Sequence, residues 1–387
     1  MHRKWNFSVA RLASAFITLS IRFKSTKARP SAPLGSRILT SPDDIFKHNM
    51  WDHVQWTKED EENARQRAEE NSSVQLPLTD QGKFDTGACQ YWDKFYEVHQ
   101  DKFFKDRHWL FLEFPELLPS WMKEQSTITG HDHQRPENLF QARSGADAEM
   151  GPHQHKDPTP THRSVDHTYF QKEAQEQNEA ATQNSSYPGH QASFRILEVG
   201  CGVGNSVFPI VNNIKETNSF LYCCDFSPRA IQLVKAHPDY DDSVCHAFVH
   251  DICEDVASFP FPPLSLDVIL AVFVLSSIHP DRMQGVVERL SANLKPGGIF
   301  LFRDYGRYDL SQLRFKKGRC LSENFYTRGD GTCVYFFTKE EVHDLFSKTG
   351  LEEIQNLEDK RLQVNRGKKV VMRRVWMQSK FRKPQPS

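Results

Sequence analysis

The sequence predicts an α/β fold in which a mostly parallel sheet is covered by helices on both faces. Phe194–Val199 is a short apolar run that suits a buried strand, and a glycine-rich loop and a helical stretch, Asn205–Ile214, follow it directly. Leu266–Leu275 is almost uniformly apolar, as expected of a central parallel strand covered on both sides. Two further apolar segments between these runs each end beside an acid. This order is typical of open sheets that bind a nucleoside at the carboxyl ends of their strands.

The glycine loop gives the sharpest signal. Gly200, Gly202 and Gly204 alternate with small residues at the turn from strand to helix. Glycines there let a ligand approach the backbone closely, and the helix N-terminus favours polar or anionic groups. A dinucleotide-binding loop would have its third glycine where this chain has Asn205. The G-x-G-x-G form behind Glu198 instead resembles the cofactor loop of the S-adenosylmethionine (SAM)-dependent methyltransferases.

Acids at the ends of the next two strands agree with a nucleoside site. Ser219–Cys224 ends on Asp225, at the position where such sheets hold the ribose hydroxyls. His246–Val249 leads to Asp251 and Ile252, which in this class receive the adenine amino group and pack on its ring. The predicted cofactor residues of the core are Gly200, Gly202, Asp225, Asp251, Ile252 and Val272.

We expect a seven-stranded sheet over residues 194–383. A helix over Asp281–Leu294 and a turn at Lys295–Gly298 precede the fifth strand, Ile299–Arg303. Val370–Lys380 is expected to be the last strand and antiparallel to its neighbours.

Composition narrows the class of protein further. The net charge of −1 does not by itself indicate a nucleic-acid partner, so any basic surface must be local. Eight cysteines without a C-x-x-C pair argue against disulfides and zinc and favour a reducing compartment. No apolar run approaches the ~18 residues of a membrane span, so no membrane is expected.

The first 42 residues are basic, rich in serine and threonine, and free of acids. On a helix, Lys4, Arg11 and Arg22 fall together, and the apolar side chains share another face: Trp5, Leu12, Phe16, Leu19 and Phe23. This pattern predicts a mitochondrial presequence over residues 1–30 and a matrix location; without the leader the protein would be cytosolic or nuclear. The alternative is a basic arm that touches RNA, which has no need of the apolar face.

Residues 126–191 are rich in polar residues and proline, with little apolar periodicity, and are expected to be a disordered linker. The linker holds two closely spaced histidine pairs, His131 with His133 and His153 with His155. No fixed scaffold would hold them, so we expect no metal site.

Residues 43–121 are expected to form a substrate-facing module beside the site, and Ala88–Pro119 within it is dense in aromatic and basic residues. Trp92 and Tyr96 are four residues apart and share one helix face. Either this helix packs on the core, or Trp92 and Tyr96 cover the cofactor while Lys105, Arg107 and His108 face the substrate. Aromatic rings beside cations suit a sulfonium or an extruded base.

A second basic cluster follows the fifth strand. Six cations lie between Arg303 and Arg319, interleaved with aromatic residues. The bland interpretation is a solvated face, but the carboxyl end of a parallel strand favours phosphate and base contacts. The candidate RNA contacts are Arg307, Arg314, Lys316, Lys317 and Arg319.

Together these motifs resemble the tRNA 3-methylcytidine methyltransferases, which modify cytidine 32 of the anticodon loop. The matching pieces include HNMWDHVQW, YWDKFY, FFKDRHWLFLEFPEL, ILEVGCGVGNSVFPI, VFVLSSIHPDRM, FRDYGRYDLSQLRFKKG and NFYTRGDGT. FFKDRHW and RDYGRYD are specific to this family, and the basic leader resembles that of its mitochondrially targeted member. The resemblance implies SAM as cofactor, the tRNA anticodon loop as partner, threonine, serine or arginine isoacceptors, and for some members seryl-tRNA synthetase. A monomer is expected.

Chemistry agrees with this resemblance. The chain lacks the Asp/Asn-Pro-Pro-aromatic run of amino methylation and the Pro-Cys pair of C5 methylation. N3 carries its own lone pair and needs alignment, exclusion of water and anionic support, because the product is a cation. Asp304 is the candidate for that support, with Arg303 placing it or a phosphate. The rival functions are an inactive RNA-binding adaptor and a methyltransferase for protein or a small molecule; the intact loop and acids oppose the first, and the basic–aromatic patches the second.

Overall fold

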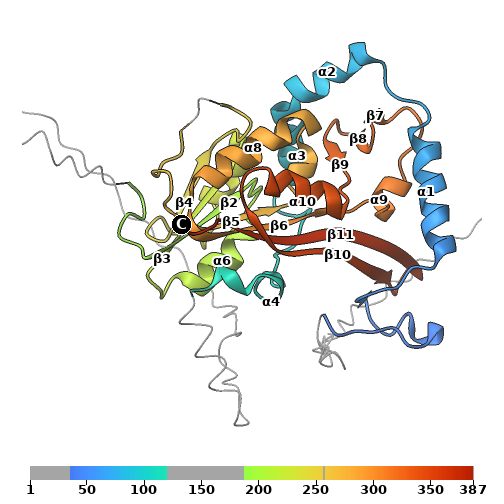
Figure 1. Cartoon of the computed structure of the whole chain (residues 1–387), viewed down its shortest axis with the longest axis horizontal. Coiled ribbons are helices and arrows are strands. Elements are labelled where there is room, and N and C mark those ends of the chain that lie inside the picture. Colours follow the sequence, from blue (N-terminus) through green and yellow to red (C-terminus); the bar gives the residue numbers. More distant parts are fainter. Residues whose placement is uncertain (1–34, 120–186, 256–257, 387) are drawn as a thin grey trace, which may run out of the picture.

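The computed structural model describes residues 35–119, 187–255 and 258–386, and its centre is a mixed sheet of eight strands (Figure 1). The predicted presequence and most of the predicted linker lie outside these residues. The end of the predicted linker is described: the Pro188 carbonyl accepts a hydrogen bond from Tyr222, and the Gly189 carbonyl accepts one from Arg195. Residues 187–191 therefore pack against the sheet.

The strand order is β1-β10-β11-β6-β5-β2-β3-β4. The parallel core consists of β2 (Phe194–Val199), β3 (Ser219–Asp225), β4 (Cys245–Val249), β5 (Leu266–Val272) and β6 (Leu294–Tyr305). β11 (Val370–Arg382) pairs antiparallel with β6, and β10 (Glu352–Asn365) pairs antiparallel with β11. The predicted α/β class and the antiparallel last strand are thereby confirmed.

The sheet has one strand more than the predicted seven. β1 (Met50–Trp51) comes from the N-terminal segment and pairs with Leu362 and Gln363 of β10. A two-residue strand carries no period-2 pattern of its own, so the sequence could not indicate it. The predicted turn at Lys295–Gly298 is a bulge inside β6, where the register with β5 shifts between Leu266 and Val268.

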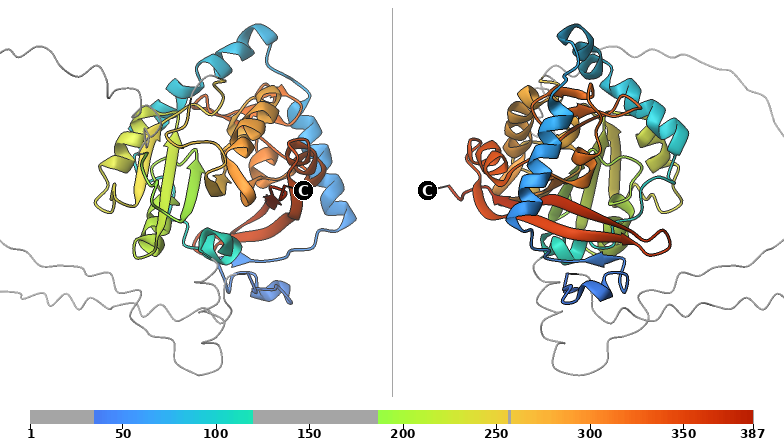
Figure 2. Two further views of the ribbon diagram at one scale, coloured as in Figure 1. Left: turned by 60° about the vertical axis from the view of Figure 1, so that its left-hand side comes forward. Right: turned by 90° about the vertical axis from the view of Figure 1, so that its right-hand side faces the viewer.

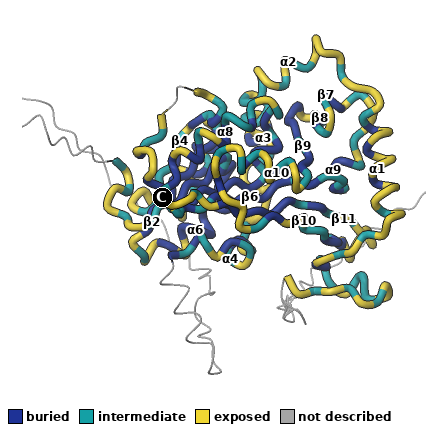
Figure 3. The backbone as a smooth tube through the Cα atoms, viewed as in Figure 1, coloured by how far each residue is buried: buried dark blue, intermediate teal, exposed yellow. Residues whose placement is uncertain are grey.

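Helices cover both faces of the sheet, and the strands between them are buried (Figure 3). α8 (Pro280–Ala292) and α10 (Lys339–Ser347) pack on one face through residues such as Val286 and Phe346. α6 (Val207–Ile214), α7 (Pro228–Lys235) and α4 (Leu110–Glu113), followed by the short 3-10 helix η2 (Pro115–Leu117), cover the other.

The N-terminal segment wraps around one end of this core (Figure 2). It begins with the 3-10 helix η1 (Pro42–Asp44), and α1 (Lys58–Ser72) then starts at a capping box on Thr57. Asn71 of α1 donates to the backbone of Leu313 in α9 (Leu310–Leu313), and Ser72 hydrogen-bonds Tyr326. Tyr326 belongs to a small antiparallel sheet of β7 (Cys320–Ser322), β8 (Phe325–Thr327) and β9 (Cys333–Tyr335). α2 (Leu78–Thr86) and α3 (Ala88–His99) complete the segment.

All eight cysteines are free thiols. Within the described ranges, no helix has both the length and the apolar character that a membrane crossing requires.

Candidate functional site

A cavity of about 480 Å³ lies at the carboxyl ends of β2, β3 and β5. Its volume is in the range typical of small-molecule sites. The core contributes the glycine loop, the ends of β3 and β4, and the 3-10 helix η5 (Leu275–Ser277). α2 and α3 line it from the N-terminal segment, and the start of α8 and the small sheet of β7, β8 and β9 line it as well, so the N-terminal segment and the core build the cavity together.

The glycine loop is shaped so tightly that side chains do not fit. Gly200 and Gly202 have φ of +57° and +54°, in the left-handed region. A Cβ on Gly200 would lie 2.5 Å from Val274, and one on Gly202 would lie 2.9 Å from the Tyr96 hydroxyl. The loop therefore brings bare backbone to the cavity and fits closely under α3.

Asp225 is buried at the end of β3 and lines the cavity. One carboxylate oxygen accepts from the backbone N–H of Gly202 at 2.9 Å, and the other from that of Ser227 at 2.9 Å. Burial raises the pKa of Asp225 to about 6, although both donors oppose the shift. Each oxygen keeps a free lone pair that a hydroxyl can use.

Asp251 and Ile252 lie beside Asp225 on the cavity wall. The Asp251 carboxylate accepts from the backbone N–H of Cys253 at 2.8 Å, which fixes its direction. His250 also lines the wall, and its backbone N–H donates to the Asp225 carbonyl.

Six of the eight predicted cofactor residues line the cavity: Trp92, Tyr96, Gly200, Asp225, Asp251 and Ile252. Gly202 lies under Tyr96 rather than on the wall. Val272, the last residue of β5, is buried in the core on the α6 face and does not line the cavity. Phe273, the next residue, lines it instead.

α3 combines the two roles considered for it. Its Trp92 and Tyr96 rings lie 5.8 Å apart and line the cavity, while Phe95 and Tyr96 pack with Val203 and Ala230 of the core. Asp93 fixes the helix by accepting hydrogen bonds from the Ser227 hydroxyl and the Arg229 backbone.

Sequence reasoning missed α2, which contributes Gln81, Phe84 and Asp85 to the cavity. Asp85 forms an ion pair of 3.2 Å with Arg282 of α8. The helix is nine residues long, contains a glycine and buries no residue fully, so it has no strong apolar face. Its one usable signal was Pro77 followed by Asp80 in the first turn.

Arg107, a predicted RNA contact, points inward. Its guanidinium lies 3.6 Å from one oxygen of the buried Glu198 and donates to the Ser206 hydroxyl at 2.6 Å. Burial raises the pKa of Glu198 to about 7, with Arg107 opposing. A buried carboxylate needs a nearby cation, and this need explains the inward position.

Asp304 does not line the cavity as a free carboxylate. It is fully buried, and its two oxygens accept from the backbone N–H groups of Ser276 at 2.9 Å and Tyr305 at 2.8 Å. Burial raises its pKa to about 6, against these donors. Its visible role is to hold η5, whose Ser277 lines the cavity.

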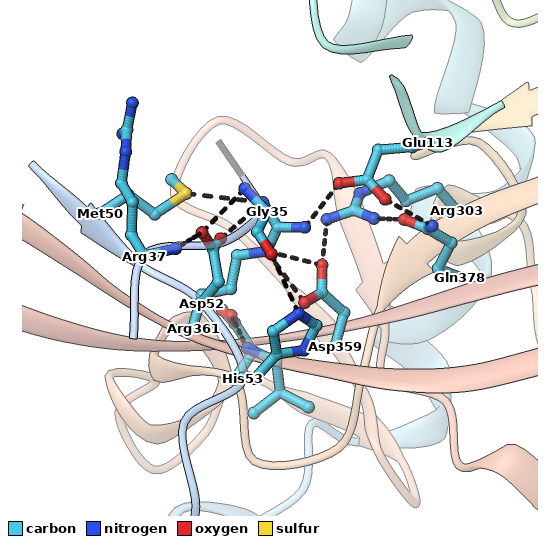
Figure 4. Close-up of polar contacts among 12 residues, drawn as sticks. Gly35, Arg37, Met50, Asp52, His53, Glu113, Arg303, Asp359, Arg361 and Gln378 are labelled. Atoms are coloured by element: carbon cyan, nitrogen blue, oxygen red, sulfur yellow. Dashed lines mark hydrogen bonds and ion pairs between the residues drawn. The ribbon is translucent and has the colours of Figure 1, made fainter. Parts of the chain in front are cut away.

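Arg303 precedes Asp304 on β6, so the two side chains point to opposite faces of the sheet, and Arg303 lies beside Asp359 and Gln378 (Figure 4). Its guanidinium donates to Asp359 at 2.6 Å and to Gln378, and it is stacked between Trp109 and Trp376. Arg303 is 3% exposed, so it is closed to a phosphate as well. Successive residues of β6 alternate in direction, which a motif written as letters does not reveal.

The other predicted RNA contacts divide into two groups. Arg307 is held in place because its Nη2 donates to both carboxylate oxygens of Glu341 and its Nε donates to the Phe336 carbonyl. The remaining residues are exposed, and in the part of the chain that the structure describes none of them forms an ion pair: Lys105, His108, Arg314, Lys316, Lys317 and Arg319.

The cavity fits SAM in several respects. Glu198 keeps one buried oxygen without a partner beside the bare glycine loop, Asp225 and Asp251 offer acceptors for a nucleoside, and Trp92 and Tyr96 offer rings to a cation. Among residues 35–119, 187–255 and 258–386, no group of three or more His, Cys, Asp or Glu side chains is placed to hold a metal.

The sheet order, the glycine loop and the two acids define a class I SAM-dependent methyltransferase, and a family profile described as "Methyltransferase domain" matches residues 197–300. The chain is 50% identical over 359 residues to the tRNA N(3)-cytidine methyltransferase METTL2 of Danio rerio, a match that covers 93% of this chain and 91% of that one. It therefore belongs to the tRNA N3-cytidine methyltransferase family, as its motifs indicated.

Two further relatives lie in the same family. Human METTL2B is 48% identical over 357 residues, which cover 90% of this chain and 93% of that one. The mouse protein named "tRNA N(3)-cytidine methyltransferase METTL8, mitochondrial" is 46% identical over 269 residues, which cover 65% of this chain and 89% of that one. These likenesses establish the family without singling out its mitochondrial member.

Proposed function

We propose that the protein transfers the methyl group of SAM to N3 of cytidine 32 in the anticodon loop of mitochondrial tRNAs of the threonine and serine type. The observation that carries the proposal is an intact cofactor cavity whose wall is shared with the N-terminal segment, next to exposed, unpaired cations. Membership of the tRNA N3-cytidine methyltransferase family supports the choice of base and atom.

Methyl transfer to N3 does not require a titratable side chain to accept a proton. N3 has an in-plane lone pair and no proton, so no general base is needed. SAM supplies a methyl group on a positively charged sulfur; the new N3–carbon bond forms as the sulfur–carbon bond breaks, and the positive charge passes to the base. The protein must align the base, exclude water and stabilise the charge.

We assign these tasks to named residues. Asp225 and Asp251 bind the nucleoside part of the cofactor. Gly200 and Gly202 let the cofactor lie close to the backbone of the glycine loop. Ile252, Trp92 and Tyr96 contact the rings and the sulfonium of the cofactor. Asp304 acts through η5, which it holds against the cavity, and adds a buried negative charge behind it. The N3 edge is used in base pairing, so the target must be unpaired or flipped out.

Location in the mitochondrial matrix rests on the acid-free basic leader, residues 1–30, and is consistent with the mitochondrial relative. The leader fused to a fluorescent reporter should carry it into mitochondria. A reporter that stays diffuse in the cytosol would remove the targeting claim and leave the enzymatic one.

Substrate class is tested by incubating the protein with labelled SAM and, separately, tRNA, unstructured RNA and protein extract. Label in tRNA alone, recovered as 3-methylcytidine by nucleoside mass spectrometry, supports the proposal. Label in protein, or no label anywhere, favours the rival functions. Adding seryl-tRNA synthetase shows whether that partner is needed, and sedimentation tests the expected monomer.

A further inference from the structure

We propose that a groove on the outer side of α2 and α3 is a second base site, in which an unpaired base next to the target cytidine stacks while its phosphates pair with surrounding cations. The proposal rests on the proposed function, because it needs an RNA strand that enters the cavity. It goes beyond that function by assigning a binding site outside the cavity.

The groove has a volume of about 470 Å³ and adjoins the cavity, because Phe84 lines both. Its aromatic floor is the Phe84 and Tyr91 pair, stacked with ring centroids 5.8 Å apart and an interplanar angle of 28°. Tyr91 lies flat on Gly331, where a Cβ would be 2.3 Å from the ring. Gly331 therefore leaves room for the Tyr91 ring. Neither Gly331 nor Tyr91 lines the cofactor cavity, so cofactor binding does not require this arrangement.

Four cations surround the platform: Lys83, Lys94, Arg319 and Arg328. Within the described residues, none of the four forms an ion pair with a carboxylate. Arg328 is fixed by hydrogen bonds to the Thr332 hydroxyl and the Cys333 carbonyl, which leaves guanidinium N–H groups available. The groove's acid, Asp330, accepts from the backbone and hydroxyl of Thr332. The charge of the groove is therefore complementary to a polyanion.

The groove continues away from the cavity. Arg328 and Gly329 also line a second groove of about 350 Å³ that contains the exposed Arg314. Shared lining residues thus connect the cavity, the aromatic groove and a further basic groove in series. This is the arrangement expected for a single strand that leaves the active site.

Aromatic side chains extend the platform at its other rim. His99 and Phe95 line the groove, and Phe103, which is 55% exposed, lies 4.9 Å from each of their ring centroids. Exposed rings next to unpaired cations favour stacked bases over an acidic peptide, which needs the cations but not the rings.

The test uses anticodon stem-loops in which the nucleotide on one or the other side of the target cytidine is abasic. Kd and methylation are measured for the wild type, Tyr91→Leu and Tyr91→Phe. Removing the stacked base should weaken wild-type binding about 10- to 100-fold. The Kd of Tyr91→Leu for the intact stem-loop should equal the Kd of the wild type for the abasic stem-loop. The abasic stem-loop should bind Tyr91→Leu no more weakly than the intact one does. Tyr91→Phe should behave as the wild type.

Charge reversal gives an independent arm. Lys94→Glu should weaken RNA binding and lower the salt slope of log Kd by about 0.7 for each lost phosphate contact. Lys215→Glu is the matched control, because Lys215 is an exposed lysine at the end of α6 outside both grooves. Neither lysine lines the cavity, so SAM affinity should stay at the wild-type value and show that both variants fold.

The outcomes separate the two proposals. Wild-type protein that binds the stem-loops but methylates none of them contradicts the proposed function, while the Kd values still decide the base site. Wild-type methylation with equal Kd for Tyr91→Leu and Tyr91→Phe on every RNA overturns the base site alone. Competition by an acidic peptide as strong as that by RNA would overturn it too, in favour of a protein partner.

Discussion

Three buried carboxylates lie at or behind the cofactor cavity, and they are stabilised in two ways. Glu198 has the Arg107 guanidinium nearby, whereas Asp225 and Asp304 each accept two backbone N–H groups. Burial raises the pKa of all three, to about 7 for Glu198 and about 6 for the two aspartates. The site therefore carries groups that change charge just below neutral pH.

Cofactor binding should accordingly fall at acid pH. Ionised Asp225 accepts from Gly202 and Ser227 and offers lone pairs to a ribose, so SAM affinity should rise with pH through about 6. The contribution of Asp225 to folding stability changes with pH in the opposite direction. The folded state binds the extra proton between pH 3.8 and about 6, so the Asp225 contribution is present at low pH and is lost as pH rises through that window.

Calorimetry of SAM binding between pH 5 and 8 tests this expectation. Asp225→Asn should bind more weakly at pH 8 and lose the part of the pH dependence that centres near 6. An Asn variant with wild-type affinity would remove Asp225 from the site.

Asp304→Asn tests the positioning role of Asp304. An asparagine has one acceptor oxygen where two backbone donors now point, so about 1–3 kcal/mol of stability should be lost. We expect SAM affinity within a few-fold of wild type and turnover reduced by about 10²–10⁴, the range for one electrostatic contributor. Single-turnover rates and denaturant unfolding measure the two effects. Wild-type turnover in a destabilised variant would make Asp304 purely structural.

At the scale of elements, the contact between the glycine loop and α3 makes the site. Gly202→Ala puts a Cβ 2.9 Å from the Tyr96 hydroxyl at a φ of +54°. Strain and clash together should weaken SAM binding about 10- to 100-fold. Adding Tyr96→Phe removes the clashing oxygen and should restore part of the affinity, because the next ring atoms are at ordinary contact distance. Equal losses in the single and double variants would show that the two elements do not meet in this way.

The elements that the sequence could predict are those with strong periodicity. The strands from Phe194 to Val272 are mostly apolar segments in a fixed order, and the positions of the acids follow from their ends. α2 and β1 were not predictable, because neither has an apolar repeat and both depend on partners far along the chain. The directions of Arg107, Arg303 and Asp304 also escaped prediction, since burial decides them and a motif does not encode burial.

At the scale of the whole molecule, buried ion pairs join the N-terminal segment to the core. Arg361 of β10 lies 3.3 Å from Asp52, 2.6 Å from Glu113 and 2.8 Å from Asp359 (Figure 4). Burial would raise the pKa of Asp359, but Arg303 and Arg361 hold it below its ordinary value. The predicted substrate-facing segment is thus built into the enzyme and not tethered to it.

The predicted leader, residues 1–30, falls outside the residues that the structure describes, and its two interpretations predict different outcomes when it is deleted. Deleting residues 1–30 should leave in vitro turnover on a tRNA transcript almost unchanged and abolish 3-methylcytidine on mitochondrial tRNAs in cells. A basic RNA arm predicts weaker binding in vitro and a smaller salt slope. Turnover of purified protein and nucleoside analysis of mitochondrial tRNA measure both.

The most direct test of N3 methylation replaces that single atom. Purified protein is given SAM and an anticodon stem-loop whose target is cytidine or 3-deazacytidine, in which carbon stands in place of N3. We expect 3-methylcytidine by mass spectrometry from the first RNA, no methylation of the second, and similar binding of both. Methylation of the deaza RNA at that residue, or a product methylated at C5 or at the amino nitrogen, would contradict attack by N3.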